Sequence, residues 1–242
     1  MNSQTTSSGY RARVAHTRAI PRRHLLTGSA AVTTLSQVGL LHAQARSGTP
    51  DFSAKELKEL GKGGGAGRYF EFRENGRRYL GALSYAGVLR SADVVFNILS
   101  QPKHLKEALP ATRDVKFLHP DGAEQGEQRI FVVQGTTLIN GSYWATWDAL
   151  PEKREIRFKL DPSRPHDTQD LSGFFRVQPF KRGSLLTAAV AIAPGSGLLA
   201  SMFEGLVLDY MQRPARYIRR YVHRVTPKTR ESNPRFRTKR TH

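Results

Sequence analysis

The chain has 242 residues, 38 Lys and Arg against 20 Asp and Glu, and 38% hydrophobic residues, which suits one medium domain with appendages or two small domains. The absence of Cys excludes disulfides, thiolate metal sites and a cysteine nucleophile. A formal net charge of +18 favours an anionic partner, either nucleic acid or the face of a phospholipid membrane.

The first 45 residues have the pattern of an export signal. They contain five Arg and no Asp or Glu, and a weakly apolar stretch at 25–41 leads to the small-x-small sequence at 43–45. Arg22-Arg23 followed by His24 and two Leu resembles the twin-arginine motif of the Tat pathway. We expect residues 1–45 to be a Tat-type signal peptide and the protein to be periplasmic. The alternative is a disordered basic arm.

Residues 46–77 are expected to be a linker and the start of a hairpin. A short helix is predicted at 50–60, capped by Asp51 or Ser53. The glycine-rich stretch 61–67 lacks the residue order of a phosphate-binding loop, so we interpret it as a flexible spacer. An Asn-Gly pair at 75–76 joins two β-prone runs, which predicts a tight hairpin.

A single domain is predicted at 78–225. Two short helices come first, at 92–99 with Ser91 as cap and at 103–108. Turn residues then separate six β-prone runs, which indicates an antiparallel meander: 114–118, 128–138, 142–149, 155–160, 170–179 and 183–193. Apolar residues spaced by three and four predict a long helix at 196–222, and Pro214 predicts a break in it near Gln212.

This order of elements resembles the START-like (SRPBCC) superfamily of polyketide cyclases, lipid-transfer START domains and Bet v 1-like proteins. Residues 91–96, with Asn97 and Leu99, look like the family's opening helix. Residues 172–179 and 183–187 look like its penultimate hairpin, which the long terminal helix follows. The resemblance implies an α+β helix-grip fold, in which a curved antiparallel sheet surrounds the terminal helix and leaves a cavity for a hydrophobic ligand.

Alternation along the strands and periodicity along the helix select the residues expected to line this cavity. Ordinary core packing is the alternative for each of them, and a slip of one residue would turn a strand's whole set to the other face. The candidates are Phe131, Tyr143, Trp147, Phe175 and Leu186 on the sheet, and Met202, Phe203, Leu206 and Tyr210 on the helix.

The sequence predicts no catalytic set. The groups weighed for proton transfer are Tyr143, Asp148, His166, Asp167, Arg176 and Tyr210. The His residues lack H-x-x-x-H and H-E-x-x-H spacing, and G-x-S-x-G is absent, so neither a metal site nor a serine hydrolase is expected. We also expect no cofactor.

The last segment, 226–242, is basic and poor in apolar residues, so we expect a disordered tail. Attraction to anionic lipid head groups suits an exported protein better than nucleic acid does. A tail that only aids solubility is the alternative.

We therefore expect a monomeric, exported protein that binds or carries a lipid or isoprenoid-like molecule without catalysis. One alternative is a cyclase or dehydratase that acts on a polyketide-like or aromatic substrate. Another is an interaction module that uses the fold without a ligand. The sequence leaves open whether the hairpin at 69–77 caps the cavity or extends the sheet.

Overall fold

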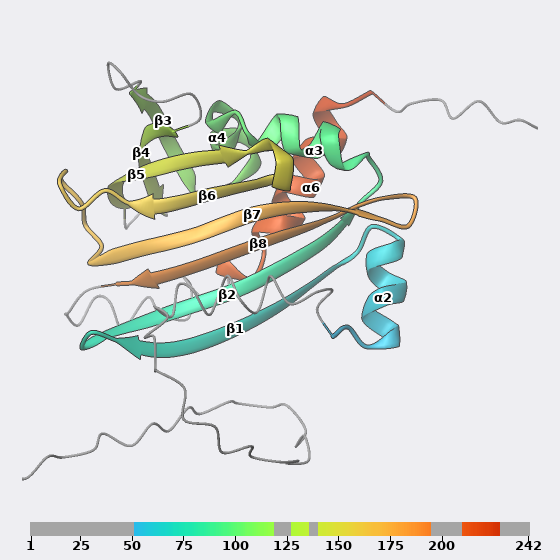
Figure 1. Ribbon diagram of the computed structural model, residues 1–242, viewed down its shortest axis with the longest axis horizontal. Coiled ribbons are helices and arrows are strands. Elements are labelled where there is room, and N and C mark those ends of the chain that lie inside the picture. Colours follow the sequence, from blue (N-terminus) through green and yellow to red (C-terminus); the bar gives the residue numbers. More distant parts are fainter. Residues whose placement is uncertain (1–50, 119–126, 136–139, 195–209, 228–242) are drawn as a thin grey trace, which may run out of the picture.

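An eight-stranded antiparallel sheet, strongly curved, forms the body of the protein (Figure 1). The computed structural model describes residues 51–118, 127–135, 140–194 and 210–227. The strand order is β1-β2-β8-β7-β6-β5-β4-β3, and every neighbouring pair is antiparallel. Strands β3 to β8 therefore form the predicted meander, and the N-terminal hairpin joins it through β2 and β8. The α+β class is confirmed.

The boundaries of most elements agree closely with those expected from the sequence. In chain order the elements are α2 Ala54–Gly61, β1 Gly65–Glu74, β2 Arg77–Val88, α3 Ala92–Leu99, a 3₁₀ turn Pro102–His104, α4 Leu105–Ala108, β3 Thr112–Leu118, β4 Glu127–Gly135, β5 Asn140–Leu150, a 3₁₀ turn Pro151–Lys153, β6 Glu155–Leu160, β7 Asp170–Phe180, β8 Gly183–Ala193 and α6 Pro214–Val225.

Local signals explain these agreements. Ser53 and Ser91 cap α2 and α3 by accepting hydrogen bonds from backbone N–H groups in the first turn, as predicted. Asn75 (φ 50°) and Gly76 (φ 74°) both adopt the left-handed conformation that a two-residue hairpin requires. This hairpin places β1 at one edge of the sheet, so it extends the sheet.

The inner face of the sheet, defined here as the face that carries α3, α4 and α6, holds the main hydrophobic core. Figure 1 looks onto the opposite, outer face, and α6 passes behind β7 and β8. The core joins α3 and α6 to the even-numbered residues of β2 and β8, such as Ala86 and Leu186, both 0% exposed. Burial of each such aliphatic side chain contributes about 1.5–3 kcal/mol when it is of Val or Leu size.

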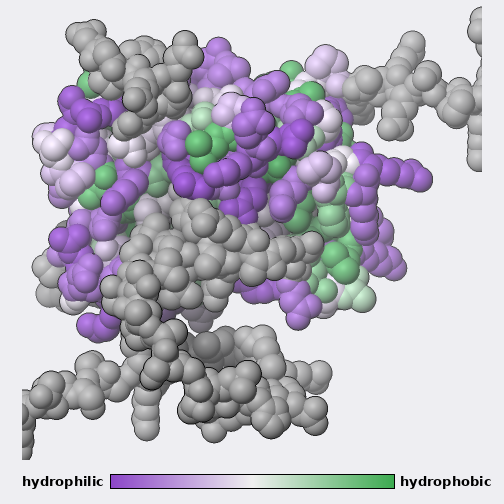
Figure 2. Space-filling view, in the orientation of Figure 1, coloured by the Kyte–Doolittle hydropathy of each residue, from purple (hydrophilic) through white to green (hydrophobic). Residues whose placement is uncertain are grey.

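The outer face carries α2 and a smaller cluster built from Phe52, Leu60, Tyr85 and Leu185. Phe52 meets Tyr85 edge to face, with ring centroids 5.0 Å apart. Elsewhere the visible part of this side is mainly hydrophilic among the described residues (Figure 2). The inner face therefore packs against α3, α4 and α6, and the outer face packs against α2 and the residues just before it.

The glycine-rich stretch 61–67 is not simply the flexible spacer expected from its composition. Strand β1 begins at Gly65, and Gly87 N–H donates to the carbonyl of Gly64 at 3.0 Å. A Cβ at Gly65 would lie 2.9 Å from Cγ of Arg216, and one at Gly67 would lie 3.2 Å from Cβ of Gln212. The glycines therefore let the C-terminal segment approach the edge of the sheet.

The break predicted in the terminal helix is confirmed. A helical turn at Tyr210 and Met211 ends at Gln212, and α6 then begins at Pro214. Arg213, the N-cap residue, supplies no side-chain cap. The buried Ser84 hydroxyl on β2 instead accepts a hydrogen bond from Ala215 N–H at 3.2 Å, so the sheet caps α6. The predicted helix before Tyr210 lies outside the described residues, as do the predicted signal peptide and residues 228–242 of the predicted tail.

Candidate ligand site on the inner face

Three aromatic rings from adjacent strands form the centre of the inner face. Trp147 on β5 lies 5.9 Å from both Phe158 on β6 and Phe175 on β7, measured between ring centroids. Phe158 and Phe175 are 5.4 Å apart. The register explains the cluster, because Trp147 pairs with Phe158 and Ile156 pairs with Phe175, which turns all these side chains to one face.

Trp147 carries a polar atom that no described residue satisfies. The residue is 2% exposed, and its buried indole Nε1 has no hydrogen-bond partner in the described ranges. A buried donor left unpaired costs about 1–3 kcal/mol. An acceptor on a bound molecule would recover that free energy, so this atom marks the inner face as a candidate ligand site.

Three tyrosines lie beside the core that contains this cluster. Tyr143 on β5 is half-buried and packs against the core, while Tyr210 and Tyr217 stack with centroids 5.9 Å apart. Burial raises the pKa of Tyr210 to about 12, and burial together with Tyr210 raises the pKa of Tyr143 further. Both phenols therefore stay protonated at neutral pH, and they suit hydrogen bonding to a ligand better than proton abstraction.

The structure brings four of the predicted cavity residues together on this face and moves one away. Tyr143, Trp147, Phe175 and Leu186 lie on the inner face with the core. Phe131 does not, so its prediction is wrong. It pairs with Trp144 on the outer face, with centroids 5.1 Å apart, while its neighbours on β4 point into the core.

Of the residues expected on the helix, Tyr210 is described and lies beside Tyr143 and Tyr217. Met202, Phe203 and Leu206 lie outside the described residues. Sequence reasoning missed Phe158 and Tyr217 as residues of the site. Phe158 comes two residues after the buried Ile156 on β6, so the two side chains share a face, and Tyr217 follows Tyr210 by about two helical turns. The spacing of these residues could therefore have identified both.

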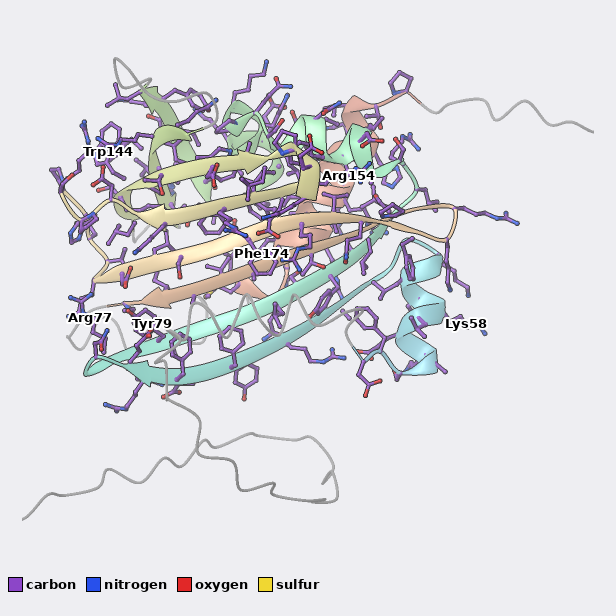
Figure 3. All side chains as sticks on the ribbon, viewed as in Figure 1. Lys58, Arg77, Tyr79, Trp144, Arg154 and Phe174 are labelled. Atoms are coloured by element: carbon purple, nitrogen blue, oxygen red, sulfur yellow. The ribbon has the colours of Figure 1, made fainter. Side chains whose placement is uncertain are left out.

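The acidic and basic groups weighed for proton transfer lie away from this site. Arg176 is on the outer face, where its guanidinium approaches Glu155 at 2.6 Å and lies 5.0 Å from the ring centroid of Phe174. Figure 3 labels Phe174 on β7. His166 is exposed in the loop between β6 and β7. Asp167 accepts hydrogen bonds from the backbone and hydroxyl of Ser142, which holds that loop against β5. Asp148 lies on the outer side of β5, one residue from Trp147.

A contact not anticipated from the sequence joins the helices that cover the site. His104 Nδ1 and Tyr221 Oη lie 2.5 Å apart in a hydrogen bond between the 3₁₀ turn before α4 and α6. Burial, followed by the charge of Lys103, lowers the pKa of His104. This bond fixes α4 and α6 relative to one another over the inner face.

Within the described ranges, no group of three or more His, Asp or Glu is arranged to hold a metal ion. The helices in these ranges are also too short or too polar to span a bilayer.

No family model matches the chain, and no curated protein matches it by sequence. Among solved structures, a protein from Thermus thermophilus is similar with a TM-score of 0.52 and 14% identity, over 62% of this chain and 99% of that one. The Zhui aromatase/cyclase from Streptomyces sp. R1128 is similar with a TM-score of 0.50 and 16% identity, over 65% and 94%. A STAR-related lipid transfer protein from Xanthomonas axonopodis gives 0.49 and 15%, over 65% and 94%. The chain has the START-like helix-grip fold.

Proposed function

We propose that this protein is an exported carrier that binds a hydrophobic small molecule, a lipid or isoprenoid-like compound, against the inner face of its sheet. The observation that carries the proposal is the buried Trp147 N–H without a partner, set among Phe158 and Phe175. Aromatic walls with one or two polar groups are typical of sites for small apolar ligands. The ligand would carry an oxygen acceptor that meets this N–H.

Carriage is favoured over catalysis by the arrangement of charge. In the described part of the chain, the carboxylate of Glu155 is paired with Arg157 and Arg176 on the outer face, away from the aromatic cluster. On the inner face, Tyr143 and Tyr210 have raised pKa values. A general base at neutral pH needs a pKa near 7, which neither phenol has.

The alternative is a cyclase or dehydratase for a polyketide-like or aromatic substrate. Its support is the similarity in fold to the Zhui aromatase/cyclase. Tyr143 and Tyr210 would then serve as acids or as hydrogen-bond donors to a substrate carbonyl.

Export belongs to the same proposal, on the evidence of the pattern in residues 1–45. Replacement of Arg22 and Arg23 by Lys is expected to block export through the Tat pathway in a bacterial host. Cell fractionation measures this, and unchanged export would contradict the Tat route.

The two tryptophans of the chain allow a direct test of ligand binding, because they lie on opposite faces of β5. Trp144→Phe leaves Trp147 as the sole indole, and Trp147→Phe leaves Trp144. We expect isoprenoid alcohols, fatty acids or polycyclic aromatic phenols to change the emission of the Trp144→Phe variant in a saturable way. The matched Trp147→Phe variant should show no change.

Native mass spectrometry of the full chain, purified from a bacterial envelope and extracted with solvent, identifies any bound compound. Recovery of added ligand with unchanged mass supports the carrier, and loss of one water from a polyketide-like compound supports the dehydratase. If no compound co-purifies and none changes the emission of Trp147, the binding proposal fails.

A further inference from the structure

Four basic side chains form a stripe along α6. Arg216 and Arg220 are four residues apart, as are Arg219 and His223, and the two pairs are adjacent around α6, so all four share one side of the helix. The opposite side carries the buried residues that pack on the sheet, among them Ile218, which is 0% exposed. The stripe is therefore directed away from the core.

This charge is not neutralised within the described ranges. There, the one ion pair of α6 joins Arg224 to Glu107 at 3.6 Å, and no carboxylate lies within 4.0 Å of Arg216, Arg219 or Arg220. Burial, followed by the charges of Arg220 and Arg216, lowers the pKa of Arg219. Because neighbouring cations repel one another, an anion bound here would relieve that repulsion.

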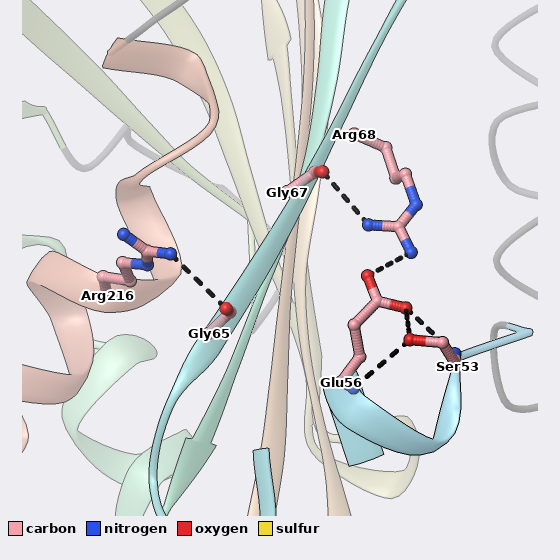
Figure 4. Close-up of polar contacts among 6 residues, drawn as sticks. All are labelled: Ser53, Glu56, Gly65, Gly67, Arg68 and Arg216. Atoms are coloured by element: carbon pink, nitrogen blue, oxygen red, sulfur yellow. Dashed lines mark hydrogen bonds and ion pairs between the residues drawn. The ribbon is translucent and has the colours of Figure 1, made fainter. Parts of the chain in front are cut away.

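The stripe continues onto the edge of the sheet. Arg216 donates to the carbonyl of Gly65 at 3.4 Å, on the side of β1 opposite to α2 (Figure 4). A Cβ at Gly63 would lie 3.2 Å from a guanidinium nitrogen of Arg219 and 4.0 Å from Cγ of Leu89. Arg219 and Leu89 therefore flank the same glycine.

An aliphatic side chain lies exposed beside these cations: Leu89 is 49% exposed. Arg90, adjacent to Leu89, donates from Nε to the hydroxyl of Thr226 at 2.7 Å, which holds the β2–α3 connection against the end of α6. Both segments lie toward the right-hand end of the sheet in Figure 1. We call this surface the basic end face; it consists of Leu89, Arg90, Arg216, Arg219, Arg220 and His223.

We propose that the basic end face docks the protein on an anionic phospholipid bilayer. A polybasic surface gains about 1 kcal/mol for each cation that comes close to anionic lipid, and exposed aliphatic side chains enter the interfacial region. Nucleic acid matches the cations but offers no comparable place for Leu89. The surface needs no bound ligand, so this inference stands or falls separately from the carrier function.

Vesicle co-sedimentation of the full chain tests the proposal. The vesicles contain equal parts of phosphatidylglycerol and phosphatidylcholine, or phosphatidylcholine alone. Arg216→Gln with Arg220→Gln removes two cations from the face and is expected to weaken binding to the anionic vesicles by about 30-fold, from about 1 kcal/mol per cation. Arg113→Gln with Lys159→Gln removes the same charge from exposed positions on β3 and β6, and is expected to change binding by less than about threefold.

The basic tail is present in both double variants, so a difference between them reports on the face. Equal losses in the two variants would attribute binding to net charge or to the tail, and would overturn the proposal. A second result would also overturn it. In that result the wild type binds duplex DNA more tightly than anionic vesicles, and the Arg216/Arg220 variant loses binding to DNA but keeps binding to vesicles.

Insertion of Leu89 can be tested separately, because the chain has no Cys. Leu89→Cys and Leu118→Cys each provide a single site for an environment-sensitive fluorophore, and Leu118, at the end of β3, is also exposed (39%). We expect a blue shift on anionic vesicles at position 89 and none at position 118. A shift at neither position, or equal shifts at both, would contradict docking through this face.

Discussion

Two buried polar groups on opposite faces of the sheet differ in their pairing. On the outer face, the carboxylate of Glu155 is 1% exposed and is held by Arg157 and Arg176, each at 2.6 Å. On the inner face, the Trp147 N–H is equally buried and has no partner in the part of the chain that the structure describes. Buried polar groups in native proteins are nearly always paired. The outer pairs thus contribute to the fold, and the unpaired inner atom is available to a ligand.

The largest effect is expected from Glu155→Ala on the outer face. Removal of the carboxylate breaks its ion pair with the largely buried Arg176, and breaking a buried pair by removing one partner destabilises proteins by about 3–5 kcal/mol. Equilibrium denaturation in urea measures the loss. Glu71→Ala is the matched control, since Glu71 pairs with Arg78 in solvent and is expected to cost about 0–1 kcal/mol. Similar losses in both variants would show that burial of the pair does not matter.

Two buried serines on the inner side of β2 and β8 give the same contrast between a paired and an unpaired group. Ser84 accepts the N–H of Ala215, whereas the buried Ser184 hydroxyl has no partner among the described residues. Ser84→Ala should cost about 1–3 kcal/mol, because it orphans a buried N–H at the start of α6. Ser184→Ala should be neutral or slightly stabilising, because it removes a desolvated hydroxyl. Thermal denaturation of the two variants distinguishes these outcomes, and a larger loss for Ser184→Ala would contradict the assigned bonding.

The order and boundaries of the strands were predictable because their signals are local. Turns at Asn75-Gly76 and at Lys181-Arg182-Gly183 separate neighbouring strands. The left-handed conformations of Asn75 and Lys181 confirm both turns. Caps such as Ser91 work in the same way. Tertiary packing did not need to be known for any of these features.

The face of β4 was not predictable in the same way. The strand contains four consecutive apolar residues, Ile130, Phe131, Val132 and Val133, so its hydrophobic pattern does not show which of them face the core. The register with β5 decides this and turns Phe131 outward. The ordered glycine stretch was missed for a similar reason: its composition indicates flexibility, while contacts with Arg216 and Gln212, about 150 residues away in the chain, give it structure. The unpaired Trp147 N–H likewise exists only after folding.

A smaller effect is expected from pH, through the helices that cover the inner face. Burial and Lys103 lower the pKa of His104, and burial, Arg90 and Arg219 lower the pKa of His223. The folded protein therefore takes up these protons less readily than the unfolded chain, where His titrates at about 6.5. The contribution of the two neutral histidines to the free energy of unfolding is therefore complete above about pH 6.5 and is lost as the pH falls below it.

Thermal denaturation at pH values above and below this point measures the loss, and His104→Gln should reduce it. An identical pH dependence in that variant would show that His104 does not contribute.

The smallest effect on ligand binding is expected from Phe131→Leu, and it separates the faces most directly. Phe131 packs on Trp144 across the sheet from the aromatic cluster, so its truncation should cost only about 0.5 kcal/mol of stability and leave ligand affinity unchanged. Phe175→Leu makes the same chemical change within 5.9 Å of Trp147, and it should alter the affinity measured by Trp147 emission. If Phe131→Leu weakened binding as much as Phe175→Leu, the ligand would not be recognised by the inner face alone, and the unpaired indole would lose its significance as a marker of the site.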